Sequence, residues 1–365
     1  MLRHLLHTLL ALPARLRFRR ALQRRAVIAP AGEPALSYGE VLNGSGLVAG
    51  GKVKLLHLRE RWAERDPFNV LYLVSSAIPP FAAELVRWAK RTGARFVWNQ
   101  NGVGFPAWAG WRTSDTNLPM ADLLHQADHV VYQSEFCRES ADRWLGAPSA
   151  PSSVLYNPAD TSVFRPAATP PNPHEVWRLL AAGTHYQPFR VLGALETLRV
   201  LLDAGHRAQL TVAGRMCWSD AEAQVHAAIE RLRLIEHVSI RPAFSQEEAV
   251  PLFQSAHLLL HLKYHDPCPT VVVESLACGV PVVASHSGGM PELLGHDGGE
   301  LVHVPLSWRR AAYPSPRPLA AAVARIMAQW EERHVAARAR AERLFRKETW
   351  VDAHAKIFQG LLETR

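Results

Sequence analysis

One segment of the sequence places two acids beside a predicted helix start. In HDPCPTVVVESLACGVPVVAS, Asp266 follows the apolar run HLLLHL, and Glu274 lies one turn inside a helix for which Thr270 is the expected N-cap. The free N–H groups from Thr270 to Val273 would form an anion site. Carboxylates accept hydrogen bonds from hydroxyls, so this pattern predicts a site for a nucleoside diphosphate sugar. A loop acid and a helix-surface acid without function are the alternative.

Residues 265–295 resemble the donor site of a family of retaining glycosyltransferases (glycosyl transferases group 1, family 4-like), and the resemblance extends over most of residues 45–305. The motifs that carry it are an acid and a Glu at the spacing of Asp266 and Glu274, then GVPVVAS and SGGMPELL. The resemblance implies a GT-B architecture and catalysis without a metal ion. It also implies that Asp266, in place of the family's longer Glu, binds the donor sugar and that Glu274 binds the ribose. The implied diphosphate contacts are Pro269, Thr270 and Val271.

The sequence departs from the family at the positions where basic residues would bind the diphosphate. Thr184 stands where the family usually has Arg, and Arg190 is the candidate for the family's Lys. Arg215 and Lys263 are further candidates, because a cation near the leaving diphosphate would stabilise its developing charge. A surface role is the alternative for each of them.

The first half of the chain carries a second set of candidates. In NGSGLVAGGKVKLLHL, Gly50 and Gly51 match the family's glycine loop, for which an ordinary turn is the alternative. Asn101 stands where the family often has a His that contacts the transferred sugar, and an amide can orient a hydroxyl but cannot shuttle a proton. The candidates for contacting the acceptor are Trp98, Trp108 and Ser134, with core packing as the alternative for the tryptophans.

Strands and helices must alternate to position these residues. Apolar runs of strand length alternate with helix-length segments, which predicts parallel sheets covered by helices. We therefore expect an α/β fold of two facing, Rossmann-like, doubly wound domains, with the ligand at the carboxyl ends of the strands. The expected divisions are a basic arm at 1–32, an acceptor-side domain at 33–166, a nucleotide-sugar-binding domain at 167–345, and a C-terminal helix at 346–365 that packs back on the first domain.

Basic charge is concentrated at the start of the chain. The 365 residues carry a net charge of +8, and seven of the 41 basic residues lie within residues 1–25, where there is no acid. This concentration disfavours a nucleic-acid partner. Leucines at helical spacing predict either an amphipathic arm on a membrane surface or a packed helix, with a break or kink at Pro13. No apolar run is long enough to cross a membrane, so we expect a cytoplasmic protein, with the arm as a candidate contact to the inner face of the membrane.

The cysteines and histidines do not form a recognisable metal or disulfide pattern. Four cysteines without a C-x-x-C pair predict free, buried thiols in a reducing compartment. His125 and His129 are four apart, as are His257, His261 and His265, but no further ligand motif accompanies them. There is also no D-x-D sequence, so we expect no metal and no cofactor besides the nucleotide sugar.

Together these residues predict a metal-independent retaining glycosyltransferase. It would move a sugar from a nucleotide diphosphate sugar to a saccharide or lipid-linked acceptor, in cell-surface polysaccharide or glycolipid synthesis. A sugar-nucleotide epimerase or a phosphorylase on the same fold is one alternative. The other is a catalytically silent subunit that binds donor or membrane, and the departures at Thr184 and Asn101 leave it open.

Overall fold

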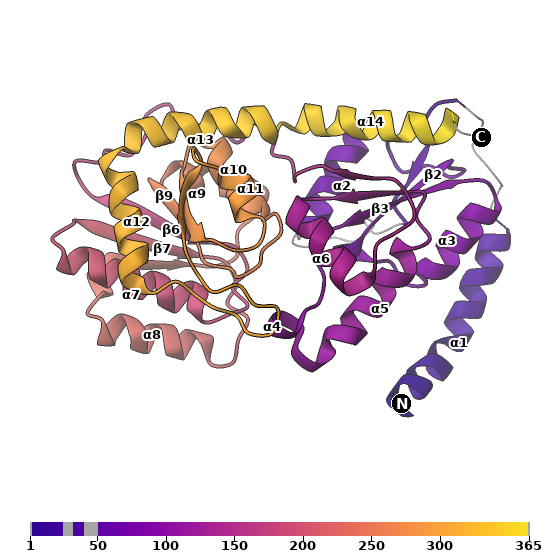
Figure 1. Cartoon of the computed structure of the whole chain (residues 1–365), viewed down its shortest axis with the longest axis horizontal. Helices are drawn as coiled ribbons and strands as arrows, with labels where there is room; N and C mark the ends of the chain where they lie inside the picture. The colour runs from indigo at the N-terminus through magenta and orange to yellow at the C-terminus, as the bar shows by residue number, and fades with distance from the viewer. Residues whose placement is uncertain (1, 25–31, 40–49, 364–365) are drawn as a thin grey trace.

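The computed structural model describes residues 2–24, 32–39 and 50–363, which form two α/β domains side by side (Figure 1). The first domain is built on a parallel sheet with the strand order β1-β2-β3-β4-β5. Its strands are β1 (Leu36–Ser37), β2 (Val70–Val74), β3 (Arg95–Gln100), β4 (His129–Tyr132) and β5 (Ser152–Val154). Its helices are α1 (Leu2–Gln23), α2 (Gly50–Arg61), α3 (Ala82–Arg91), α4 (Pro106–Ala109), α5 (Thr113–Leu124) and α6 (Glu135–Leu145).

Both faces of this first sheet are covered by helices. Every residue of β2 is buried, as expected for a parallel strand between two helical layers. One layer is formed by α3, α5 and α6, and the other by α2 and the C-terminal helix α14 (Lys347–Glu363). The strand order runs in a single direction through the described strands, without the reversal of a doubly wound sheet. The layers of this domain are therefore those of the Rossmann-like fold that the sequence predicts.

The sheet of the second domain reverses its strand order. Its parallel sheet has the order β11-β10-β9-β6-β7-β8, which changes direction between β6 and β9. Such a switch point opens a crevice at the carboxyl ends of the two central strands. The strands are β6 (Trp177–Ala182), β7 (Ala208–Ala213), β8 (Val238–Arg241), β9 (Leu258–His261), β10 (Val282–Ser285) and β11 (Gly299–Val302). The helices are α7 (Phe189–Asp203), α8 (Ala221–Arg231), α9 (Gln246–Gln254), α10 (Thr270–Ala277), α11 (Met290–Leu294), α12 (Pro316–Ala328) and α13 (Trp330–Leu344).

The chain passes between the domains twice, and the two passages are paired. Ala159 N–H donates to Phe345 O at 2.7 Å, and Lys347 N–H donates to Ala159 O at 3.0 Å. Ala159 and Phe164 already belong to the core of the second domain, so the first passage lies before the expected boundary at 166. After the second passage, α14 runs along the first domain, where Trp350, Val351 and Phe358 are buried.

One local prediction differs from the structure. Helix α1 continues through Pro13 from Leu2 to Gln23, without the expected break. At the other end of the described chain, α13 ends at Leu344, and the second interdomain passage separates it from α14. None of the helices in the described parts of the chain has both the length and the apolar character needed to cross a membrane.

Candidate active site

A wide cavity lies between the two domains, at the carboxyl ends of the strands of both sheets. Its volume is about 900 Å³. The predicted residues Asn101, Arg190, Arg215, Lys263, Asp266, Pro269, Thr270, Val271 and Glu274 all line it. Residues that are far apart in sequence therefore converge on one cleft, as the predicted donor site requires.

Helix α10 presents its N-terminus to this cleft. The N-cap is Pro269 rather than Thr270, and no side chain caps the helix. The N–H groups of Val272 and Val273 donate to Pro269 O, at 3.1 and 3.3 Å. The backbone donors at the start of α10 that remain for a ligand are thus those of Thr270 and Val271, fewer than the four that the sequence suggested.

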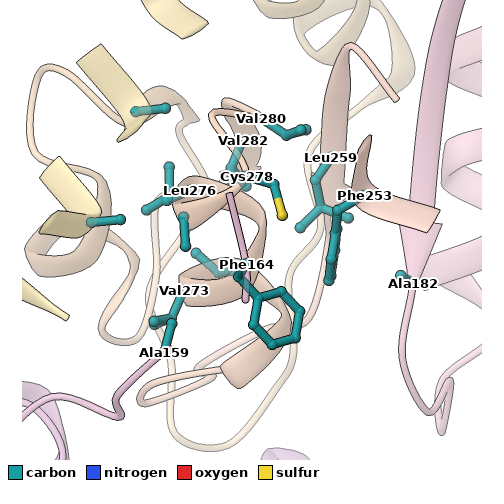
Figure 2. Close-up of a cluster of buried hydrophobic side chains, with 14 of the residues drawn as sticks. Ala159, Phe164, Ala182, Phe253, Leu259, Val273, Leu276, Cys278, Val280 and Val282 are labelled. Carbon is teal, nitrogen blue, oxygen red and sulfur yellow. The ribbon is translucent and has the colours of Figure 1, made fainter. Parts of the chain in front are cut away.

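A buried apolar cluster fixes the direction of α10. Val273 and Leu276 on the helix pack against Leu259 and Val282 of the neighbouring strands and against Phe253 (Figure 2). Each fully buried aliphatic side chain contributes roughly 1.5–3 kcal/mol to stability. The position of the helix start in the cleft therefore depends on core packing rather than on a cap.

Asp266 is buried in the cleft as an ion pair. Its Oδ2 lies 3.1 Å from Lys263 Nζ and 3.2 Å from His261 Nε2. Burial raises the pKa of Asp266, but the Lys263 charge and the His261 hydrogen bond outweigh it and hold the pKa well below its usual range. Asp266 is therefore a carboxylate at neutral pH, with an oxygen able to accept a bond from a hydroxyl.

The SGG turn of the sequence motif holds the Asp266 loop in place. Gly289 N–H donates to Asp266 O at 2.9 Å, and the Ser287 hydroxyl accepts from His265 N–H at 3.1 Å. A Cβ on Gly288 would lie 2.5 Å from Asp266 O, and Gly288 also has a φ of +65°. Only glycine allows this close approach. The turn thus positions the acid on the neighbouring loop.

Glu274 differs from Asp266 in its charge state. It is 3% exposed and has no ion-pair partner among the described residues. Burial raises its pKa to about 8, partly offset by a hydrogen bond from Gln246. At neutral pH the carboxyl group is therefore mainly protonated, and it can both donate and accept hydrogen bonds.

The candidate cations differ in how freely they reach the cleft. Lys263 is bound to Asp266, and Arg215 is an exposed residue of the wall. Arg190 is 6% exposed, and its guanidinium donates to the carbonyl oxygens of Thr184 and Ala182, while its Nε has no partner in the described structure. Arg190 thus supplies a fixed positive charge below Thr184.

Lys54, which the sequence analysis did not single out, lies beneath the floor of the cleft. Its Nζ donates to Oδ1 of Asn101 at 2.6 Å, of Asn99 at 2.8 Å and of Asn157 at 3.1 Å, and Gln133 Oε1 lies at 3.4 Å. Burial lowers the pKa of Lys54 to about 8. Because a lysine only donates, it fixes the orientation of all these amides.

The amides extend this network in two directions. Asn157 Nδ2 donates to Cys268 O at 2.5 Å, which links the network to the loop before α10. Asn99 Nδ2 donates to Tyr72 OH at 2.7 Å, and Tyr72 OH lies 2.9 Å from His354 Nε2 on α14. The sequence did contain a signal for this network. Each of the strands β3, β4 and β5 ends in, or is followed by, a residue with an amide side chain, and Lys54 shares a face of α2 with the apolar residues Leu55 and Leu58.

A second cavity of about 320 Å³ adjoins the first on the side of the first domain. The two cavities share Asn101, Lys263 and Asp266. The wall of the second cavity is mainly apolar and aromatic, and of the charged side chains only Lys263 and Asp266 line it. Its apolar lining includes Val103, Phe105, Trp108, Met120, Phe136 and Tyr264.

Of the three residues predicted to contact the acceptor, one lines the second cavity and two do not. Trp108 lines the second cavity and is 51% exposed. Trp98 is fully buried and its Nε1 donates to Gln100, so the expectation that it stacks on an acceptor is wrong. Ser134 is also buried, and its hydroxyl caps α6 by accepting from Cys137 N–H.

The glycine loop is only partly described. Gly50 and Gly51 form the first turn of α2, and the loop residues before them lie outside the described part of the chain. The role predicted for this pair stays a prediction.

The histidines and cysteines that the sequence analysis considered as metal or disulfide candidates have other contacts. His125 bonds Leu145 O and His129 bonds Ser153, and the described residues contain no group of His, Cys, Asp or Glu side chains that could hold a metal ion. All four cysteines are free, but Cys217 is exposed rather than buried as expected.

A carboxylate of the second domain binds the first domain beside the cleft. Glu292 on α11 accepts from the N–H groups of Glu135 at 2.7 Å and Phe136 at 2.8 Å, at the start of α6. Arg340 of α13 donates to the carbonyl oxygens of Glu292 and Leu293 and so holds α11. This contact fixes the two walls of the cleft relative to each other.

Comparisons with known proteins agree with this geometry. Residues 182–343 match the family model described as "Glycosyl transferases group 1". The match spans most of the second domain, and the two-domain architecture of the chain is the GT-B fold. The match includes Asp266 and Glu274, so both predicted acids lie within the family's own sequence pattern.

Solved structures share the two-domain fold at low sequence identity. The sucrose-phosphate synthase (tll1590) from Thermosynechococcus elongatus has a TM-score of 0.64 and 18% identity, over 82% of this chain and 75% of that one. Anabaena Alr3699/HepE in complex with UDP and glucose has a TM-score of 0.62 and 17% identity, over 84% and 80%. The glycosyltransferase AviGT4, involved in avilamycin A biosynthesis, has a TM-score of 0.56 and 17% identity, over 92% and 99%. A search of curated proteins by sequence finds no match.

Proposed function

We propose that this protein is a retaining glycosyltransferase that works without a metal ion and uses a nucleotide diphosphate sugar as donor. The observation that carries the proposal is that Asp266, Glu274 and the N-terminus of α10 line a single interdomain cleft. The volume of about 900 Å³ is in the range of cavities that hold ligands of this size. The solved structure of Alr3699/HepE in complex with UDP-glucose, on the same fold, supports this class of donor.

The donor is placed by the charges of the cleft. The diphosphate lies against the N–H groups of Thr270 and Val271, where the helix start and Lys263 offset its negative charge. The ribose hydroxyls bond Glu274, which can donate or accept because its pKa is raised to about 8. The transferred sugar lies toward Asp266, whose carboxylate accepts from its hydroxyls.

In the proposed reaction an acceptor hydroxyl attacks the anomeric carbon on the face from which the phosphate leaves. The anomeric C–O bond to the phosphate breaks, the new glycosidic C–O bond forms, and the acceptor proton passes to the leaving phosphate oxygen. No side chain needs to act as a base, which agrees with an amide at Asn101. Asn101 and Lys263 lie where the two cavities meet, and there they can orient the attacking hydroxyl.

The second cavity is the proposed place of the acceptor. Its aromatic wall can stack on the apolar face of a sugar ring. Its two charged side chains, Lys263 and Asp266, pair with each other and also face the donor cleft, so the rest of the described wall offers no cation for a second phosphate. The group that enters is therefore an uncharged saccharide unit, free or carried at the end of a lipid-linked acceptor.

We further propose cell-surface polysaccharide or glycolipid synthesis as the context, with the protein in the cytoplasm and peripheral on the inner face of the membrane. The support is the arginine-rich start of the chain together with a saccharide-sized acceptor cavity. The finding that would favour a catalytically silent donor-binding subunit is donor binding without turnover.

A panel of nucleotide sugars tests the proposal in two steps. Thermal shift first identifies a donor, because a ligand that binds only the folded state raises its melting temperature. Slow hydrolysis of that donor and transfer to added saccharides then measure catalysis. We expect Asp266→Ala to lower turnover by about 10²–10³-fold, the magnitude typical of losing a preorganised polar contact at a reaction centre. Glu274→Ala should mainly weaken donor binding.

The control for both variants is Glu230→Ala, which removes an exposed acid of α8 far from the cleft. Near-wild-type turnover of both cleft variants would refute the assignment of the site. Inversion of the anomeric configuration in the product would refute the retaining mechanism but not the site.

A further inference from the structure

Helix α1 packs on the first domain through only one of its faces. Leu22 is buried in the core of that domain, and the rings of Phe18 and Phe81 lie 5.4 Å apart. Arg15 on the same face forms an ion pair with Glu84 of α3. The C-terminal half of α1 is therefore docked, while its N-terminal end extends away from the body of the molecule (Figure 1).

A cavity of about 280 Å³ lies between α1 and α3, away from the cleft. It is lined by Arg19, Leu22 and Gln23 of α1 and by Glu84, Arg87, Trp88 and Arg91 of α3. A cavity with this many guanidinium groups in its wall is suited to an anion, because arginine donors match the oxygens of a phosphate.

The charges around this cavity do not balance within the described structure. Glu84 is 6% exposed and is the acid that Arg15, Arg19 and Arg87 share, with Arg19 and Arg87 at 3.5 and 3.6 Å. Arg91 has no ion-pair partner among the described residues. Four guanidinium groups around one carboxylate leave a net formal charge of +3 in a small volume. Bringing an anion into the cavity would remove much of this repulsion.

An exposed apolar stripe leads along α1 to the same cavity. Leu12 and Leu16 are 46% and 47% exposed, and with Arg19 and Gln23 they fall on one helix face, at intervals of four, three and four residues. Large exposed leucines next to a cationic cavity are typical of a segment that lies in a membrane interface. A soluble phosphate would explain the arginines but not the leucines.

We propose that the cavity between α1 and α3 binds the phosphate of an anionic phospholipid, with Leu12 and Leu16 inserted among the acyl chains beside it. Arg19, Arg87 and Arg91 hold the phosphate, and Glu84 keeps the arginines in place when no lipid is bound. The site orients the first domain toward the bilayer, and it does not depend on the reaction proposed for the cleft.

Co-sedimentation of the full chain with vesicles tests this site. Vesicles of phosphatidylcholine with about 30% phosphatidylglycerol are compared with pure phosphatidylcholine at about 100 mM salt, where charge interactions act over about a Debye length. We expect binding to the anionic vesicles only. The double variant Arg87→Gln, Arg91→Gln should bind them about 5–30-fold more weakly, since each basic residue near an anionic surface strengthens the attraction to that surface. Leu12→Ser, Leu16→Ser should also weaken binding.

The matched control is Arg231→Gln, Arg233→Gln, which removes the same charge from exposed positions of the second domain. Equal losses in this control and in the Arg87, Arg91 variant would overturn the site, because they would show a nonspecific effect of net charge. Absence of binding to anionic vesicles would also overturn it. Competition by millimolar inorganic phosphate, with leucine variants unaffected, would identify a soluble anion as the ligand and overturn the membrane assignment. Unchanged far-UV circular dichroism and melting temperature show that the variants remain folded.

Discussion

Replacing Lys54 by Met tests whether the buried amine positions the floor of the cleft. Methionine keeps the length and the apolar stem of the side chain but removes the donor. Oxygens of Asn99, Asn101 and Asn157 then lose a bond partner within 3.1 Å. A buried polar group without a partner costs roughly 1–3 kcal/mol, so the loss is about 3–9 kcal/mol before compensation.

Part of this loss is offset because the protein no longer has to bury a charge. The pKa of Lys54 falls from 10.5 to about 8, which corresponds to roughly 3 kcal/mol by which its surroundings disfavour the ammonium form. The expected net decrease in the free energy of unfolding is therefore about 3 kcal/mol. That decrease is a large fraction of the roughly 5–15 kcal/mol that stabilises a typical protein.

The assay combines stability and kinetics. Urea unfolding followed by circular dichroism measures the stability change, and donor affinity and turnover are measured at a temperature where the variant is folded. We expect turnover to fall at least about 10-fold, because Asn101 loses the bond that orients it, while the affinity for the donor stays within about 3-fold, since most donor contacts lie in the second domain. The variant Lys356→Met, at an exposed position of α14, is the control.

Two results would refute this reasoning. If Lys54→Met were as stable as the control, the amide oxygens would not depend on the amine. If stability fell but turnover at a permissive temperature did not, Lys54 would have a purely structural role.

Two further perturbations follow from the charges and contacts of the cleft. Glu274→Gln should remove a pH dependence of stability, because the folded pKa of about 8 lies above the unfolded value of 4.5. The wild type should lose stability as the pH rises between these values, by at most about 1.4 kcal/mol per pH unit, and the variant should not. Urea unfolding from pH 5 to 8 measures the difference, and parallel stability curves for the two proteins would contradict the prediction. Glu292→Ala should leave two N–H groups of α6 without an acceptor, which lowers the free energy of unfolding by about 1–2 kcal/mol. The variant should also be cleaved faster between the domains in limited proteolysis, and an unchanged cleavage pattern would argue against an interdomain role.

The wall of the cleft that the second domain forms could be predicted because the sequence pattern behind it is local. Asp266, Pro269, Thr270 and Glu274 are close in sequence, and the strand, loop and helix that carry them follow from apolar periodicity and turn residues. Only details of hydrogen bonding were missed. The N-cap lies one residue earlier than expected, and two of the expected free N–H groups bond Pro269 O.

The first domain was harder to predict because its contacts depend on which face of a strand each residue occupies. Along β3, Trp98 points into one core cluster, whereas Val97 lies in the other, so a shift of one residue decides which core layer a side chain joins. The partners of Lys54 lie 45 to 103 residues away along the chain, and their convergence depends on the register of neighbouring strands. No local pattern contains that information.

The two hydrogen-bonded passages between the domains have a consequence for motion. The two segments are joined at Ala159, so any movement of one domain relative to the other must bend both segments at the same place. Because α14 covers one face of the first sheet but follows the second domain in sequence, that face can be covered only after the second domain has been synthesised. Removing α14 would expose this face and leave the two domains joined by one chain segment instead of two.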